Sequence, residues 1–182
     1  MVEPLLEDDL IHAGVAKAHE LGLKVVSHAM NDGVVNLAAQ MDIDVLAHCP
    51  TSNVSDETIE RWSSRTMITT LDAFGGSSTA INNLRRFQEA GTTILYGTDF
   101  GNANQVGISS AEIHLMTEAG LTASQIIESA TSIPASFWGL EGLGQINEGN
   151  RASFLIYTED PLTNPNLLSQ PDEIWIDGIQ RN

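Results

Sequence analysis

Four short apolar runs constrain what this chain can fold into more than any other feature. They are rich in β-branched residues and read KVVSHA, VLAHCP, TMITTL and TTILYGTDF, at residues 24–29, 45–50, 66–71 and 92–100. Such runs are typical of strands in a parallel sheet, which is buried on both faces. Helical patterns separate the runs, which recur at intervals of about 20 to 26 residues. This alternation predicts βα units and an α/β fold.

The helical segments are marked by apolar residues at helical spacing and by capping residues at their starts. The first is expected between Asp8 and Leu21. Thr122-Ala-Ser-Gln125 has the form of a capping box, which predicts a helix start there. Pro134 is expected to end that helix and to permit another short helical turn through Phe137 and Trp138. Four further helices are expected: one capped by Asn31 and Asp32, one from Ser55 to Trp62, one around Leu84 that stops at Gly91, and one from about Ser109 to Ala119.

The pattern changes near Gly142, where helical spacing gives way to turns with one short strand at residues 143–150. Residues 153–157 (SFLIY) and 173–178 (EIWIDG) alternate apolar and polar side chains, which predicts strands. A long polar loop that contains prolines separates them. The chain is therefore expected to hold two parts: a partial α/β barrel at residues 1–142 and a small β-unit at residues 143–182.

The net charge is −16, from 24 acidic and 8 basic side chains. A field of this sign repels nucleic acid and anionic lipid, so neither is expected as a partner. No apolar run approaches the roughly 18 residues needed to cross a bilayer. The acidic start of the chain is unlike a secretory signal, and the single cysteine, Cys49, excludes an internal disulfide. A cytoplasmic location is therefore expected.

Three of the four predicted strands end on a residue that can bind a metal or accept a proton: His28, His48 and Asp99. The carboxyl ends of parallel strands are where α/β barrels place their catalytic residues. Neighbouring strands lie about 4.8 Å apart, so two imidazoles at adjacent strand ends can converge on one ion. Imidazole and carboxylate ligands suit zinc and other first-row metals. The alternative, that both histidines are hydrogen-bonded core residues, stays open.

Other reactive side chains favour structural interpretations. Cys49 follows a histidine directly, so the two side chains should point to opposite sides of the strand and not form a nucleophilic pair. Glu112 begins a helix, where a carboxylate stabilises the helix dipole, and no catalytic role is expected for it. Exposed or half-buried positions on helices are expected for His12, His19 and His114.

In their order and spacing these segments resemble the metal-dependent amidohydrolase superfamily, above all its prolidase-like and imidazolonepropionase-like members. Residues 18–29 (AHELGLKVVSHA) and 44–50 (DVLAHCP) resemble the fifth and sixth barrel strands with their metal-binding histidines. Residues 68–74 (ITTLDAF) are similar to the seventh strand, and 89–101 (EAGTTILYGTDFG) to the eighth, whose aspartate is both ligand and general base. Residues 108–162 are similar to the family's C-terminal run.

Two departures from the family pattern matter. The H-x-H of the first barrel strand and the lysine or glutamate that ends the fourth are absent, and Ala152-Ser153 stands where Ala-Asp is usual. The resemblance thus implies a fragment: the C-terminal half of a TIM (β/α)8 barrel of the metal-dependent hydrolase type, with a small C-terminal β-unit that is part of a composite β-sandwich. Four strands cannot close an eight-stranded barrel. Two open edges are expected, and these favour self-association.

The activity that the resemblance implies is hydrolysis of C–N bonds in cyclic amides or peptide-like small molecules. His28 and His48 would hold a divalent metal, most simply zinc, with one or two ions in the complete protein. The metal would lower the pKa of a bound water and polarise the carbonyl. Asp99 would be a further ligand and, as general base and then acid, would pass a proton from water to the leaving nitrogen. The chain alone is not expected to be active without the missing half. A second interpretation is a non-catalytic α/β half-barrel that serves as a binding or assembly unit.

Overall fold

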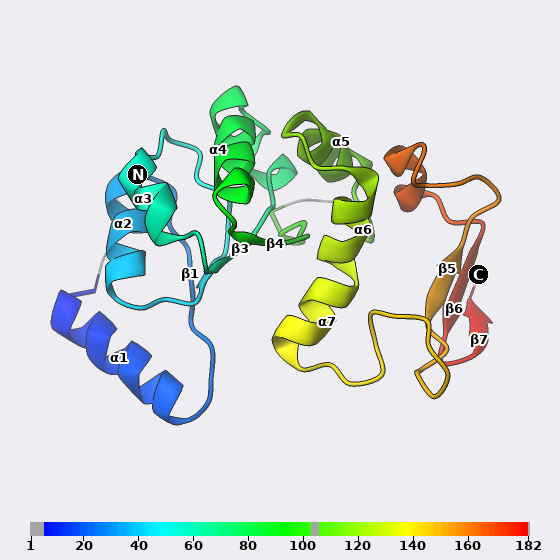
Figure 1. The fold of residues 1–182 in the computed structure, drawn as a ribbon, viewed down its shortest axis with the longest axis horizontal. Coiled ribbons are helices and arrows are strands. Elements are labelled where there is room, and N and C mark those ends of the chain that lie inside the picture. The colour runs from blue at the N-terminus through cyan, green and yellow to red at the C-terminus, as the bar shows by residue number, and fades with distance from the viewer. Residues whose placement is uncertain (1–5, 103–105, 182) are drawn as a thin grey trace. The chain divides into compact units, whose positions relative to one another are not determined.

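The computed structural model describes residues 6–102 and 106–181 and shows an α/β fold (Figure 1). Contacts between Cα atoms divide the chain into two compact units. The first contains the described residues up to Ile68 together with Ser78–Ile94, and the second contains Thr69–Ser77 and the described residues from Leu95 onward. The segment Thr69–Ser77 thus belongs to the second unit, although the helix that follows it belongs to the first.

A four-stranded sheet has the order β1-β2-β3-β4, and its strands are Val26–Ser27, Val45–Leu46, Thr66–Ile68 and Thr93–Leu95. β1 pairs with β2, and β2 with β3, in parallel. The predicted α/β fold with a parallel sheet is confirmed. The ladders are shorter than the apolar runs that predicted them, because the polar end of each run already lies in the connection to the next helix.

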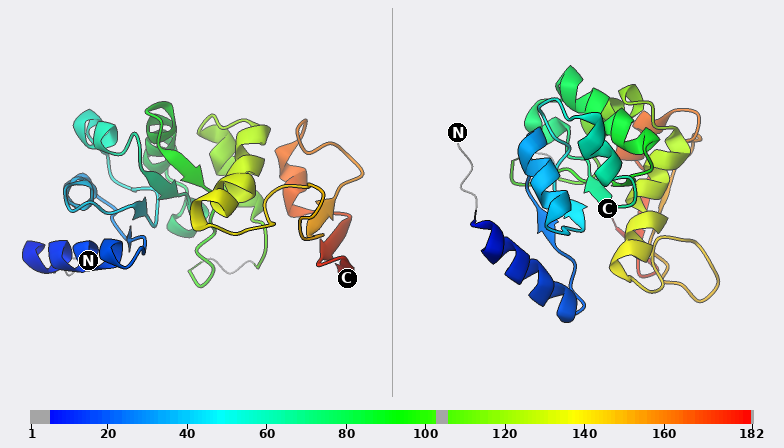
Figure 2. Two further views of the ribbon diagram at one scale, coloured as in Figure 1. Left: turned by 60° about the horizontal axis from the view of Figure 1, so that its bottom comes forward. Right: turned by 60° about the vertical axis from the view of Figure 1, so that its left-hand side comes forward.

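Four helices of the first unit follow the predicted order: α1 (Asp8–Glu20), α2 (Asp32–Gln40), α3 (Asp56–Arg61) and α4 (Ser78–Glu89). The Asn31 side chain accepts a hydrogen bond from the backbone N–H of Val34 and caps α2, and Ser55 caps α3 in the same way. Both expected caps are confirmed. Figure 2 shows α2 and α3 as neighbours, in agreement with their contacts.

The core of the first unit contains Trp62, Phe87, Leu46 and Met67, each fully buried. Burial of an apolar side chain of this size contributes about 1.5–3 kcal/mol. The indole N–H of Trp62 donates a 3.0 Å hydrogen bond to the carbonyl oxygen of Val35, so its polar atom is also satisfied. These contacts hold α2, α3 and α4 against the sheet and place the ends of β1 and β2.

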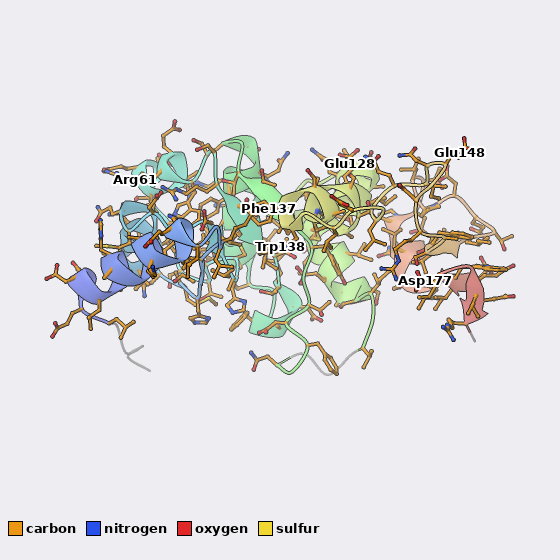
Figure 3. The ribbon with its side chains drawn as sticks, turned by 90° about the horizontal axis from the view of Figure 1, so that it is seen from below. Arg61, Glu128, Phe137, Trp138, Glu148 and Asp177 are labelled. Atoms are coloured by element: carbon orange, nitrogen blue, oxygen red, sulfur yellow. The ribbon has the colours of Figure 1, made fainter. Side chains whose placement is uncertain are left out.

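The second unit contains the short 3-10 helix η1 (Asp72–Phe74) and the helices α5 (Ser110–Glu118), α6 (Ala123–Ala130) and α7 (Ser132–Trp138). The capping box of Thr122 and Gln125 is present, as predicted. Pro134 does not end α6, which stops at Ala130; it lies in the first turn of α7, where a missing N–H costs little. At the end of α7 the rings of Phe137 and Trp138 meet edge to face, with centroids 4.7 Å apart (Figure 3).

A separate antiparallel sheet forms near the C-terminus, with the order β5-β6-β7 at Phe154–Ile156, Glu173–Ile176 and Ile179–Arg181. The loop between β5 and β6 contains the 3-10 helix η2 (Pro165–Ser169). The strands predicted at residues 153–157 and 173–178 are present, but the short strand predicted within residues 143–150 does not form, and β7 was not predicted. Its signal was Asp177-Gly178, a dipeptide typical of tight hairpins, and both residues have positive φ. A domain boundary near residue 143 stays a prediction.

No helix within residues 6–102 and 106–181 is both long enough and apolar enough to span a bilayer. The cytoplasmic location stays a prediction.

Candidate functional site

The structure brings the two histidines at the ends of β1 and β2 together. His28 directly follows β1, and His48 lies two residues after β2. Their ring centroids are 4.8 Å apart, and the ring planes meet at 76°, edge to face. His28 is exposed and His48 is half-buried. This proximity follows from the parallel pairing of the two strands, in which Ser27 lies opposite Leu46.

The spacing of the two rings fits a shared metal ion. Zn–N bonds of about 2.0–2.1 Å place two imidazoles of one tetrahedral site roughly 5 Å apart by centroid. The observed 4.8 Å is close to that separation. The same contact is also typical of two aromatic rings packed edge to face. The residues therefore fit a metal as two of its ligands, and their role as ligands stays a prediction.

Asp99 belongs to the second unit, in the loop that follows β4. Its backbone has a φ of +50°, in the left-handed region, which is unusual for residues other than glycine although aspartate tolerates it. Its carboxylate accepts a 2.7 Å hydrogen bond from the Nδ2 of Asn102. Within the part of the chain that the structure describes, no three His, Cys, Asp or Glu side chains gather as a metal site. The combined set of His28, His48 and Asp99 therefore stays a prediction.

The backbone also enters the left-handed region after β3. Thr70 has a φ of +55°, and its N–H donates a 3.2 Å hydrogen bond to the carbonyl oxygen of Gly97. A β-branched residue in this conformation is a true outlier, and such strain gathers at functional sites. Within the second unit, the segments after β3 and β4 are thus linked to each other, and each has a residue other than glycine in the left-handed region: Thr70 and Asp99.

A buried carboxylate, Glu112, holds the segment after β3. Its side chain is fully buried, and its oxygens accept hydrogen bonds from the backbone N–H groups of Leu71 at 3.0 Å and Asp72 at 2.8 Å. Burial raises the pKa of Glu112, although these hydrogen bonds partly oppose the shift. The sequence predicted only a dipole interaction here. Ser109 and Glu112 have the spacing of a capping box, in which the glutamate side chain would bond to the backbone N–H of the cap residue. The sequence therefore suggests a local partner for Glu112 and gives no signal for Leu71 and Asp72.

Two further polar side chains extend this network. The hydroxyl of Ser109 donates to the carboxylate of Asp72 at 3.2 Å, and the backbone N–H of Ser109 donates to the hydroxyl of Tyr96 at 2.7 Å. Burial raises the pKa of Tyr96 to about 12, so the hydroxyl stays protonated at neutral pH. The network connects the segments that follow β3 and β4 to the start of α5.

The remaining candidates have structural surroundings, as predicted. His12 and His114 are exposed on their helices. The half-buried His19 is 2.9 Å from the carboxylate of Asp44. Cys49 is buried and donates from its thiol to the carbonyl oxygen of Ala80 at 3.3 Å.

Comparison with known proteins agrees with the family resemblance. The model of the amidohydrolase family matches residues 6–179. An uncharacterized protein of Mycobacterium tuberculosis strain H37Rv is 25% identical over 198 residues, which cover 96% of this chain and 52% of that protein. This chain thus spans about half the length of the curated relatives that it matches.

Solved structures share the fold. A Xaa-Pro dipeptidase with methionine bound in its active site superposes with a TM-score of 0.85 at 21% identity, over 99% of this chain and 50% of that one. A prolidase in complex with N-methylphosphonate-L-proline gives a TM-score of 0.74 at 18% identity, over 97% of this chain and 49% of that one. The predicted membership of the amidohydrolase family is confirmed, and the chain covers about half of each of these structures.

Proposed function

This chain belongs to the amidohydrolase family, and from that membership we propose that it carries part of the active site of a metal-dependent hydrolase acting on C–N bonds. The observation that supports this most directly is the pair of imidazoles at adjacent strand ends, with centroids 4.8 Å apart. Two imidazoles that meet at the carboxyl end of a parallel sheet are a common part of a hydrolytic zinc site.

In this proposal His28 and His48 bind a divalent metal ion, most simply zinc, with one or two ions in the complete protein. The metal, when bound, supplies the acidity that makes water nucleophilic at neutral pH. In the complete protein Asp99 would be the further ligand and, as general base and then acid, would take a proton from the water and deliver it to the leaving nitrogen. The hydrogen bond from Asn102 at 2.7 Å orients the Asp99 carboxylate for both roles.

The proposed substrates are cyclic amides or peptide-like small molecules. The similarity of this chain to a Xaa-Pro dipeptidase and to a prolidase with a bound proline derivative supports the peptide-like class. The net charge of −16 argues against nucleic acid as a substrate. Since the chain spans about half of its relatives, turnover is expected to require the other half of the barrel.

A second candidate function is a non-catalytic half-barrel that assembles with another copy. β1 is an edge strand of its sheet, and Val26 on it is 44% exposed. Four described leucines before it are also exposed: Leu6, Leu10, Leu21 and Leu23. An apolar edge strand of this kind favours pairing. Under this alternative the two histidines would only pack against each other.

The first test is zinc stoichiometry on the purified chain and on the His28→Ala and His48→Ala variants. One ion per wild-type chain and none in either variant would support the proposal. His12→Ala, an exposed histidine of α1, is the matched control and should keep the wild-type stoichiometry. Equal zinc binding by all four proteins would contradict the proposed site, and a folded wild-type chain without zinc would favour the assembly unit.

A further inference from the structure

The loop that follows β2 is held by hydrogen bonds from α4 at alternate carbonyl groups. The Nδ2 of Asn83 donates to the carbonyl oxygens of Pro50 at 2.9 Å and Ser52 at 2.7 Å. One turn further along α4, the Nη1 of Arg86 donates to the carbonyl oxygen of Val54 at 2.6 Å. Two side chains of one helix therefore fix three carbonyl groups of one loop.

The burial of Asn83 indicates that these bonds matter. Its side chain is fully buried, and its Oδ1 has no hydrogen-bond partner in the part of the chain that the structure describes. A buried amide costs free energy that a leucine of similar size would not cost. The two hydrogen bonds that Nδ2 donates offset this cost. The amide of Asn83 therefore stabilises the loop after β2, since packing of the core alone would favour an apolar side chain.

The same loop is tied to the loop that follows β1. The backbone N–H of Ser52 donates to the carbonyl oxygen of Met30 at 3.2 Å. The Oδ1 of Asp32 accepts hydrogen bonds from the backbone N–H of Ser55 at 2.9 Å and from its hydroxyl at 3.0 Å. α4 and the two loops thus form one continuous hydrogen-bonded assembly within the first unit.

Strand pairing does not reach the two histidines. The register between β1 and β2 ends where Ser27 lies opposite Leu46, and both imidazoles come after that pair. The thiol of Cys49, the residue after His48, is bonded to the backbone of α4. The orientation of the rings of His28 and His48 therefore depends on how the loops are held.

We propose that Asn83 and Arg86 are positioning residues for the histidine pair. By fixing the loop after His48 they hold its imidazole against that of His28, in the geometry that a shared metal requires. This inference rests on the proposed function for its metal readout, while the ring contact can be tested without metal. Groups that orient metal ligands change metal affinity about 10–100-fold when they are replaced.

The decisive variant is Asn83→Leu, which removes both donors and keeps the volume of the side chain. Asn82→Leu, at the exposed neighbouring position of α4, is the matched control. Circular dichroism establishes that each protein is folded. Nuclear Overhauser effects between the ring protons of the two histidines then report their contact in the metal-free state, and a zinc titration reports affinity.

In Asn83→Leu the ring-to-ring effects should disappear and the zinc dissociation constant should rise about 10–100-fold. Arg86→Gln should likewise weaken the ring-to-ring effects and lower the zinc affinity. Asn82→Leu should match the wild type in both measurements. A folded Asn83→Leu protein that keeps the ring contacts and the zinc affinity would overturn the inference. If Asn83→Leu does not fold, Arg86→Gln decides by the same two readouts.

The two proposals fail in different ways. If the wild-type chain binds no zinc but Asn83→Leu loses the ring contact, the proposed metal site is wrong and the positioning role stands. If the wild-type chain binds zinc through the two histidines and neither α4 variant changes the rings or the affinity, the metal site stands and the positioning role is wrong.

Discussion

The Oε2 of Glu112 accepts a 2.8 Å hydrogen bond from the backbone N–H of Asp72, a residue 40 positions earlier in the chain. Glu112 is fully buried in α5, and Asp72 begins η1, just after β3. The carboxylate accepts this hydrogen bond in place of a carbonyl group of a strand or helix. α5 therefore holds the segment that the fold places at the carboxyl end of β3.

The burial of Glu112 predicts a specific pH dependence of stability. Because burial raises the pKa of Glu112 in the folded state above its ordinary value, its contribution to stability is largest below that ordinary value. The contribution decreases as the pH rises through the raised folded-state pKa. In urea unfolding, the free energy of the wild type minus that of Glu112→Gln should therefore fall as the pH rises from about 4, where the free carboxyl titrates.

A control for this pH series is Glu128→Gln, the same chemical change at an exposed position of α6 (Figure 3). The difference in unfolding free energy between wild type and Glu128→Gln gives the effect of removing an exposed carboxyl group. A difference between wild type and Glu112→Gln that is constant with pH would contradict a raised pKa of Glu112 in the folded state, and a difference that grows as the pH rises would show that the folded state favours the carboxylate form.

Arg65 should be intolerant of lysine. Its Nη1 donates to the carbonyl oxygen of Ile43 at 2.6 Å, and its Nη2 donates to the carbonyl oxygen of Ala39 at 3.2 Å and to the carboxylate of Asp42 at 3.0 Å. The guanidinium also lies 5.6 Å from the ring centroid of Trp62. An ammonium cannot reproduce this planar set of donors, so Arg65→Lys should lose about 1–3 kcal/mol of unfolding free energy in urea.

Arg61→Lys is the matched control for this substitution, because Arg61 makes an exposed ion pair with Glu57 at 2.9 Å on α3 (Figure 3). Arg61→Lys should lose only about 0–1 kcal/mol of unfolding free energy. Equal losses in the two variants would mean that the carbonyl contacts of Arg65 contribute nothing beyond a surface ion pair.

Gly144 should not accept alanine. It has a φ of +79°, and an added Cβ would lie 2.6 Å from both the carbonyl oxygen of Thr131 and the Cβ of Ala135. The left-handed conformation and the overpacking together should cost about 2–5 kcal/mol, measured by thermal or urea unfolding.

Gly149→Ala separates the two causes, since Gly149 has a φ of +89° and an added Cβ there meets nothing within 4 Å. Only the conformational cost of about 1–2 kcal/mol is expected. If Gly144→Ala is no more destabilised than Gly149→Ala, the close contacts with Thr131 and Ala135 contribute nothing to the cost of a side chain at position 144.

Zinc should stabilise the wild-type chain if the proposed site is real. A ligand that binds only the folded state, at a free concentration 100 times its dissociation constant, adds about 2.7 kcal/mol to the unfolding free energy. The midpoint of thermal unfolding should therefore rise with zinc and return to its starting value after chelation. His28→Ala should abolish the rise and His12→Ala should keep it; a rise of the same size in His28→Ala would point to zinc binding elsewhere.

Much of the fold is predictable from local pattern. The order of strands and helices follows from the period of the apolar residues, and the caps at Asn31, Ser55 and Thr122 follow from residue types next to helix starts. The contact between His28 and His48 also follows, because adjacent parallel strands bring equivalent positions together. These features depend on interactions between near neighbours or on the fixed geometry of a sheet.

Other features arise only from tertiary structure. The partners of Glu112 are 40 and 41 positions away, and the carbonyl groups bound by Asn83 are 31 and 33 positions away. A carboxylate at a helix start or an amide within a helix is compatible with many surroundings, and only packing shows whether it is buried and what it binds. The strands also pair over just two or three residues, so the loops and not the ladder hold the histidines. Hydrogen bonds between segments distant in sequence depend on the folded arrangement, which local periodicity does not contain.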